Sequence, residues 1–134
     1  MAERELYVTD THSLLWHLYD IPRLAAGASA AFEAVSRGDS TLLIPAIVLA
    51  EVVYIVERRF PHLSVDSVLD RIAAADNFRI LPFGLGEARA MIAMDAIPEM
   101  HDRIIVAAAY VFGAPLITRD GIIRLANVVE CVWE

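Results

Sequence analysis

The stretch that decides the fold is residues 6–16, which reads LYVTDTHSLLW. Its first four residues are apolar, aromatic or β-branched, and this composition is typical of a strand. From Ser13 onward, leucines recur at the spacing of a helix. Asp10 therefore lies where a strand ends and a helix begins. Ligands bind at this edge of an open α/β sheet, although a lone aspartate before a helix is most often a cap.

Length and composition predict one domain over residues 1–134 that buries extra apolar surface in an interface. The chain has 134 residues, of which 57% are hydrophobic, and its mean hydropathy is +0.52. The longest apolar runs, 42–56 and 104–118, are shorter than the about 20 residues that span a bilayer. We therefore expect an oligomer or partner interface and no membrane. A single cysteine and the lack of a signal-peptide pattern predict a cytoplasmic protein.

The charged residues exclude several classes of function. The net charge is −7, and all eleven basic residues are arginines. A negative chain does not adhere to nucleic acid through a broadly basic surface, and we expect no DNA binding by this chain alone. The absence of lysine excludes a P-loop and Schiff-base chemistry. Any phosphate must be held by arginines, backbone amides or a metal ion.

Strands and helices are expected to alternate along the chain, with no tight hairpin between strands. The expected strands are 6–9, 41–44, 79–83, 116–118 and 127–133. The expected helices begin at Ser13 and then span 23–37, 45–60, 64–75, 87–94 and 102–112. This alternation predicts a three-layer α/β/α sandwich with a mainly parallel central sheet.

Glu51 is the acidic residue whose position most needs explaining. Its neighbours at helical spacing are apolar and include Ile47, Val48 and Ile55, so we expect its side chain in an apolar stripe. A buried, unpaired carboxylate costs several kcal/mol. Glu51 must therefore be paired with an arginine, be protonated or lie near a metal ion.

Two further acids occupy element ends. Asp102 opens an expected helix, where it could be a cap or pair with Arg103. Asp120 follows a short apolar strand, as Asp10 does, and could serve a turn or a cap with Gly121. Thr118 precedes Asp120 by two residues, so on a strand both side chains would point the same way.

The four acids together favour a metal site over these separate roles. Asp10, Glu51, Asp102 and Asp120 can share one edge of the sheet, where they would repel one another unless a cation lay between them. Carboxylate oxygens without histidine or cysteine ligands favour Mg²⁺ or Mn²⁺. Such an ion would lower the pKa of a bound water and polarise a phosphate oxygen.

The sequence resembles the PIN-domain ribonucleases, and among them the VapC-type toxins of prokaryotic toxin–antitoxin pairs. The segments that carry the resemblance are 10–16, 50–52, 102–109 and 116–120, which read DTHSLLW, AEV, DRIIVAAA and LITRD. The resemblance implies a metal-dependent endoribonuclease with an α/β/α sandwich, usually dimeric and inhibited by a small antitoxin. It also implies that Asp10, Asp102 and Asp120 hold the metal, that Glu51 completes the acidic pocket and that Thr118 orients a ligand or water.

Other residues are weaker candidates for the site. Arg103 and Arg119 flank proposed site acids, and they could contact RNA phosphates or only balance the carboxylates. His12 and His101 also lie beside site acids, where orientation or packing is expected rather than catalysis. Trp16 is expected in the core or an interface.

The resulting hypothesis is an endoribonuclease that uses Mg²⁺ or Mn²⁺ on single-stranded RNA or exposed loops. The alternative is a non-catalytic PIN-like module that binds RNA or protein. A phosphatase or a receiver domain also places acids at strand ends, but both commonly use a lysine, which this chain lacks. Expected partners are a second copy of the chain and a VapB-like antitoxin. An amphipathic antitoxin helix would lie in a groove lined by the first two helices, with an arginine entering the acidic pocket.

Overall fold

The computed structural model describes residues 5–134, which form a five-stranded sheet and seven helices. The strands are β1 (Glu5–Thr9), β2 (Ser40–Pro45), β3 (Phe78–Leu81), β4 (Leu116–Ile117) and β5 (Cys131–Val132). The helices are α1 (Thr11–Leu18), α2 (Ala26–Ser36), α3 (Ala46–Arg59), α4 (Val65–Ala74), α5 (Leu85–Met91), α6 (Met100–Phe112) and α7 (Gly121–Ala126). The strand order is β3-β2-β1-β4-β5, and every neighbouring pair is parallel. The expected α/β class and the parallel sheet are therefore confirmed.

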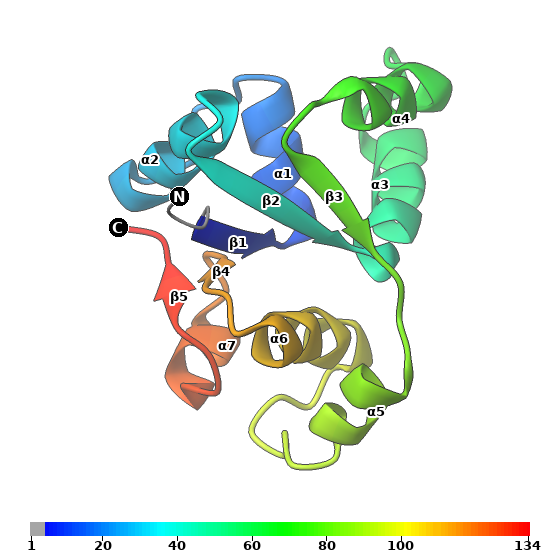
Figure 1. Ribbon diagram of the computed structural model, residues 1–134. Helices are drawn as coiled ribbons and strands as arrows, with labels where there is room; N and C mark the ends of the chain where they lie inside the picture. Colours follow the sequence, from blue (N-terminus) through cyan, green and yellow to red (C-terminus); the bar gives the residue numbers. More distant parts are fainter. Residues whose placement is uncertain (1–4) are drawn as a thin grey trace.

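The direction of chain progression across the sheet changes once, between β1 and β4. From β1 the chain moves outward to β2 and β3, and helices α1 to α4 lie on one side of the sheet (Figure 1). It then returns past β1 to β4 and β5, with α5 to α7 on the other side (Figure 1). Right-handed crossovers account for the two sides. The carboxyl ends of β1 and β4 thus form a topological switch point, which is where ligands bind in open α/β sheets.

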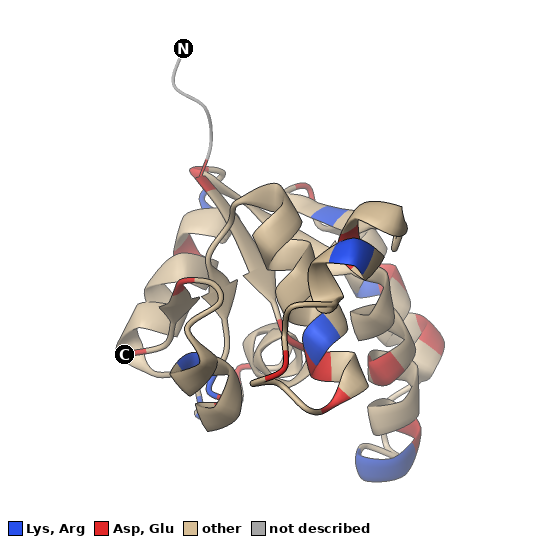
Figure 2. Ribbon diagram, turned by 90° about the horizontal axis from the view of Figure 1, so that it is seen from below, with Lys and Arg blue, Asp and Glu red and all other residues tan. Residues whose placement is uncertain are grey.

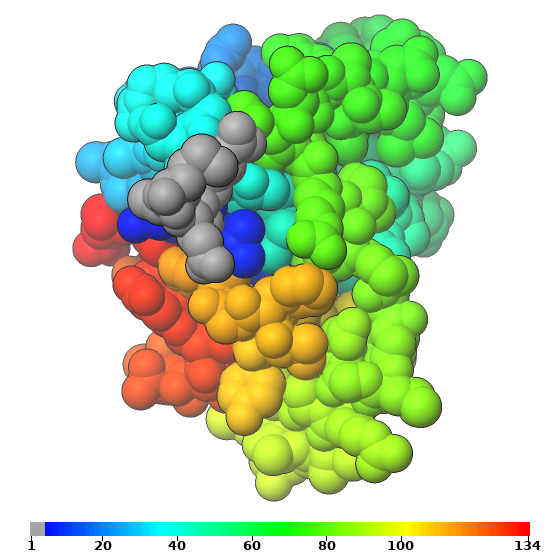
Figure 3. Space-filling view, in the orientation of Figure 1, coloured from blue at the N-terminus to red at the C-terminus, as the bar shows by residue number. Residues whose placement is uncertain are grey.

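The core lies between the central strands and the helices that cover them. Val8 of β1, the segment 42–44 of β2 and Leu116 of β4 have no exposed surface. The leucines of residues 6–16 that were expected on one helical face are buried against them, Leu14 fully and Leu15 to 2% exposure. The space-filling view shows α5 packed beside α6 at the end of the molecule opposite α4 (Figure 3).

The structure differs from the expected elements mainly near the C-terminus. Helix α7 was not expected, and the strand expected over 127–133 is only Cys131–Val132. The helix has six residues and buries only Ile123, so its hydrophobic periodicity is too short to be read from the sequence. Asn127 ends it with a φ of +52°, a left-handed conformation that asparagine tolerates better than most residues. Among residues 5–134, no helix has the length and apolar character needed to cross a membrane.

Candidate functional site

Asp10 follows β1 and begins α1, as the sequence predicts. Its Oδ1 atom accepts a hydrogen bond from the Ser13 backbone N–H at 3.0 Å, so it is also the helix cap. Its own backbone N–H donates to the Ile117 carbonyl of β4 at 3.3 Å. The cap and the strand pairing together fix this carboxylate at the carboxyl ends of the two central strands. The Ser13 hydroxyl oxygen is buried and has no hydrogen-bond partner among residues 5–134.

Glu51 is half-buried and does not lie in the buried stripe of α3, which consists of Val48, Val52 and Val56. The expectation that Glu51 lies in an apolar stripe therefore holds only in part, because α3 turns the face with Val52 to the core and leaves Glu51 at its margin. Its Oε1 atom accepts a hydrogen bond from Thr11 Oγ1 at 2.7 Å. Within residues 5–134, Glu51 forms no ion pair with an arginine. Since Thr11 follows Asp10 directly, this bond brings α3 and Glu51 to the end of β1.

Thr118 and Asp120 lie beyond the end of β4. Thr118 has no exposed surface, and its Oγ1 atom accepts a hydrogen bond from the Asp120 backbone N–H at 3.1 Å. Asp120 caps α7 by accepting from the Ile123 N–H at 2.9 Å. Thr118 therefore fixes the backbone that carries Asp120, and the cap role considered for Asp120 is correct.

Asp102 is the third residue of α6 and does not open it. The cap is Glu99, whose carboxylate accepts the Asp102 backbone N–H at 2.8 Å. The suggestion that Asp102 caps this helix is therefore wrong, because the helix begins two residues earlier than expected. The suggested partner Arg103 forms no ion pair within residues 5–134, and its Nε donates instead to the Ile97 carbonyl.

The surroundings of Asp102 shift the pKa of its carboxyl group. Burial and the nearby charges of Asp120, Glu99, Glu51 and Asp10 raise this pKa from 3.8 to about 6. The residue is only half-buried, so the neighbouring carboxylates reach it through partly solvated space. The other three acids expected at this sheet edge thus contribute, after burial, to the raised pKa of Asp102. Divalent cations suit such a set of carboxylate oxygens, although within residues 5–134 no three acid, histidine or cysteine side chains are close enough to share a metal ion.

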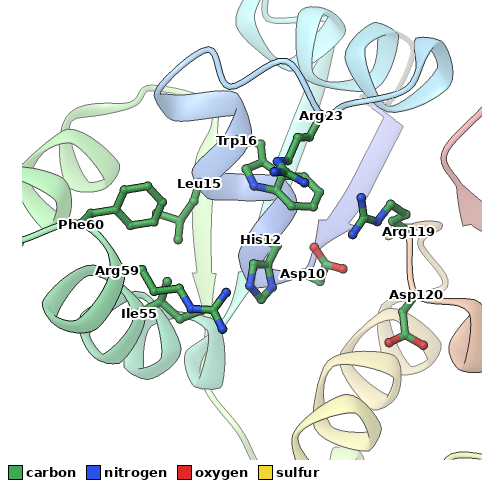
Figure 4. Close-up of a pocket in the computed structure, with 10 residues that line it drawn as sticks. All are labelled: Asp10, His12, Leu15, Trp16, Arg23, Ile55, Arg59, Phe60, Arg119 and Asp120. Atoms are coloured by element: carbon green, nitrogen blue, oxygen red, sulfur yellow. The ribbon is translucent and has the colours of Figure 1, made fainter.

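A cleft of about 410 Å³ opens beside Asp10 and Asp120. Arg59 and Arg119 point into it from opposite sides, and Arg23 lies over Trp16 (Figure 4). Glu51 and His101 line a separate neighbouring hollow. Sequence reasoning missed Arg23 and Arg59 because they lie in a loop and at a helix end, and neither is adjacent in sequence to a proposed site acid.

Comparison with known proteins assigns the family. The family model described as PIN domain matches residues 7–128. The chain belongs to the PIN-domain family. This PIN domain superposes on a chain of VapBC2 from Rickettsia felis, solved with a promoter DNA fragment, with a TM-score of 0.72 at 17% identity, covering 96% of this chain and 99% of that chain.

Other solved structures share the fold of this PIN domain. FitAcB from Neisseria gonorrhoeae gives a TM-score of 0.70 at 20% identity, covering 93% of this chain and 95% of that one. A toxin–antitoxin complex from Klebsiella pneumoniae gives 0.67 at 22% identity, covering 92% and 94%. No curated protein sequence matches the chain. The expected family is confirmed, and its solved neighbours include toxin–antitoxin complexes.

The remaining candidates occupy varied positions in this PIN domain. Trp16 is half-buried, so the expectation of a core or interface residue holds only in part, because one side of it lines the cleft. His12 is exposed with its ring centroid 5.7 Å from that of Trp16. His101 pairs with Glu99 at 3.0 Å. Burial raises the pKa of the Cys131 thiol, which fits a packing role rather than a reactive one.

Proposed function

We propose that this single PIN domain, residues 1–134, is a metal-dependent endoribonuclease and the toxin of a toxin–antitoxin pair. The observation that carries the proposal is that Asp10 and Asp120, which follow the neighbouring strands β1 and β4, line one cleft at the carboxyl ends of these strands. Burial, followed by the charges of Asp120, Glu99, Glu51 and Asp10, also raises the pKa of Asp102. Carboxylates that repel one another at a switch point are poised to bind a cation. The PIN-domain match supports the same class of activity.

In the proposed site, Asp10, Asp102 and Asp120 would hold Mg²⁺ or Mn²⁺ and Glu51 would complete the acidic pocket. Because no three of the described acids are close enough to share an ion as they stand, their side chains would have to turn towards it. A bound divalent ion would polarise a phosphate oxygen and acidify a bound water. The protein positions the carboxylates beforehand, since Ser13 and Ile123 N–H groups bind Asp10 and Asp120. Thr11 orients Glu51. Thr118 would act through the Asp120 backbone or orient a ligand.

The test replaces Asp10 or Asp120 by asparagine in separate variants. Asparagine caps helices about as well as aspartate, so both variants are expected to fold while cleavage of mixed RNA with Mg²⁺ or Mn²⁺ is lost. The matched control is Asp66→Asn, because Asp66 lies in the first turn of α4, away from the site. Full cleavage by the Asp10→Asn protein would contradict the assignment. No product from the wild type with any metal would favour the non-catalytic RNA- or protein-binding module.

We also propose a VapB-like antitoxin and a second copy of the chain as partners. The support is twofold. The solved neighbours include toxin–antitoxin complexes, and large apolar side chains such as Leu125 and Ile92 are 88% and 77% exposed. Contiguous exposed apolar patches mark protein interfaces, and the exposed side chains of Tyr110 and Val111 line one hollow together with Ala90 and Met94. Co-expression with the adjacent small open reading frame, followed by measurement of complex mass and RNA cleavage, tests both partners.

A further inference from the structure

Three arginines around the cleft have no carboxylate partner among the described residues 5–134. Arg23, Arg59 and Arg119 line it together with Asp10 and Asp120, yet none of the three forms an ion pair within residues 5–134. Each of them is exposed. Elsewhere in the described chain Arg37 and Arg124 do pair, with Asp39 at 3.1 Å and Glu134 at 3.4 Å. The cleft therefore presents three guanidinium groups that form no ion pair within residues 5–134.

Trp16 holds two of these arginines in the cleft. The Cζ atom of Arg119 lies 5.1 Å from the Trp16 ring centroid, and that of Arg23 lies 5.9 Å away. Both distances are within the range of cation–π attraction. The ring is itself held by Trp133, whose centroid is 6.2 Å away. Side chains that would otherwise move freely in solvent are thus kept beside the proposed catalytic acids.

The placement of the arginines fits an extended anion better than a single one. They come from the loop after α1, the end of α3 and the residue after Thr118, and they approach the cleft from different sides (Figure 4). Along the ribbon, the basic segments are separated by acidic and neutral ones (Figure 2). The side chains of three of the eleven arginines nevertheless line this one cleft. Planar guanidinium groups are well suited to phosphate oxygens.

We infer that this cleft binds the phosphate backbone of single-stranded RNA through Arg23, Arg59 and Arg119, with Trp16 as the residue that positions two of them. The inference rests on the proposed function, because a strand whose scissile phosphate reaches Asp10 and Asp120 must place neighbouring phosphates along the same cleft. Single strands suit it since their phosphates can follow an irregular path between the three arginines.

The test measures binding of a short, mixed-sequence, single-stranded RNA in EDTA, with the RNA checked for integrity afterwards. Affinity is recorded over a range of salt concentrations, because each phosphate contact on a single strand contributes about 0.7 to the slope of log affinity against log salt. Arg23→Gln, Arg59→Gln and Arg119→Gln are each expected to reduce the slope by about 0.7. Arg37→Gln removes the same charge outside the cleft and is expected to leave the slope unchanged.

The role of Trp16 is tested by a pair of variants. Trp16→Leu removes the aromatic face and is expected to reduce the slope by up to about 1.4, the contribution of two phosphates. Trp16→Phe keeps an aromatic face and is expected to restore most of the loss, which a purely structural role of the residue would not require. Circular dichroism and melting temperature show whether both variants fold. In a Trp133→Phe background, RNA should also change the emission of Trp16.

Several results would overturn the inference. Unchanged slopes in all three arginine variants would contradict RNA binding in the cleft. Equal binding of poly-glutamate, lost in the same variants, would instead indicate an acidic protein partner. Full competition by inorganic phosphate would indicate a site for one phosphate. If the wild type cleaves RNA but the slopes of the arginine variants are unchanged, the proposed nuclease function stands and this inference fails. If the slopes fall but no metal supports cleavage, RNA binding in the cleft is supported and the proposed nuclease function fails.

Discussion

Thr11 and Glu51 are joined by a 2.7 Å hydrogen bond between side chains that lie 40 residues apart in the sequence. Thr11 is 3% exposed and occupies the first position of α1, directly after the cap Asp10. Glu51 comes from the middle of α3. The bond therefore links the helices that follow β1 and β2. It also fixes the orientation of Glu51 through the residue that directly follows Asp10.

Replacing Thr11 by valine is expected to reduce cleavage without unfolding the protein. Valine has the shape of threonine but cannot donate to Glu51, so the carboxylate loses its fixed orientation. Groups that orient the residues of a metal site are typically worth about 10- to 100-fold in activity or metal affinity. The free energy of unfolding should fall by about 1 kcal/mol, the usual contribution of one hydrogen bond. Metal-dependent RNA cleavage and urea unfolding measure the two effects.

Thr11→Ser is the matched control for this prediction. Serine keeps the hydroxyl donor and loses one methyl group, so cleavage should stay near the wild-type rate while stability falls slightly. If valine and serine variants cleave equally well, the hydrogen bond to Glu51 has no functional role.

Removing the charge of Asp102 is expected to stabilise the metal-free protein. Burial and the surrounding carboxylates raise the pKa of Asp102 from 3.8 to about 6, so its ionised form is disfavoured in the folded state. Above about pH 6 this repulsion opposes folding, and it is relieved as the pH falls and Asp102 takes up a proton. In EDTA, Asp102→Asn should therefore melt above the wild type at pH 7 and above, and the difference should vanish below 3.8.

Divalent metal should reverse this order. A ligand that binds only the folded state raises its melting temperature, so Mg²⁺ or Mn²⁺ should stabilise the wild type and have little effect on Asp102→Asn. The variant should also lose RNA cleavage. An Asp102→Asn protein that melts below the wild type in EDTA at neutral pH would show that the carboxylate is stabilised by its surroundings, contrary to the expected repulsion.

The positions of Asp10 and Asp120 could be predicted because each follows a short apolar strand, and parallel strands place their carboxyl ends together. The setting of Glu51 could not be predicted in full. Its apolar neighbours in sequence indicated burial, but the face that a helix turns to the core depends on packing with α1 and α6. The pairing of Glu51 with Thr11 likewise depends on how two helices meet.

Asp102 and the arginines show a second limit of sequence reasoning. Glu99 and Asp102 are both plausible caps of α6, and local spacing alone does not decide between them. Arg23 and Arg59 reach the cleft only because a loop and a helix end fold towards it. Local patterns thus predicted most of the strands and helices and the place of Arg119 beside Asp120, whereas the presence of Arg23 and Arg59 in the cleft follows from tertiary structure alone.

Protonation of His17 is expected to lower the free energy of unfolding as the pH falls. Its ring stacks on Phe32 with centroids 4.3 Å apart, and burial is the main cause that lowers its pKa from 6.5, with Arg71 adding to the effect and Asp20 opposing it. The unfolded chain therefore binds this proton more readily than the folded one. The stability that the neutral ring provides is fully present above pH 6.5, and it is lost as the pH falls from that value through the lower pKa of the folded state. Urea unfolding of the wild type and His17→Phe over this range measures it.

In the His17→Phe protein, the fall in stability below pH 6.5 should be shallower than in the wild type. His62→Gln removes an exposed histidine from the loop before α4 and controls for the change in net charge. Parallel pH profiles for wild type and His17→Phe would show that protonation of this ring is no more costly in the folded state than in the unfolded one.

Two glycines in helices should respond in opposite directions to substitution by alanine. In α2, a Cβ at Gly27 would lie 2.5 Å from the carbonyl oxygen of Glu134 and 3.1 Å from that of Trp133. Because these are backbone atoms, the C-terminal segment would have to shift, and the Ala28 N–H bond to the Trp133 carbonyl, now 2.9 Å, would weaken. Gly27→Ala should therefore lower the melting temperature despite the better helix propensity of alanine.

At Gly86 of α5, nothing lies within 4 Å of the corresponding Cβ position. Gly86→Ala should therefore gain the propensity difference, up to about 1 kcal/mol. The two glycine-to-alanine substitutions thus distinguish the effect of packing against the C-terminal segment from the effect of helix propensity. The Gly27→Ala protein should also show altered Trp emission, because Trp133 contacts Trp16. If both variants melt above the wild type, the C-terminal segment is free to move away from α2, and its carbonyls do not hold that helix in place.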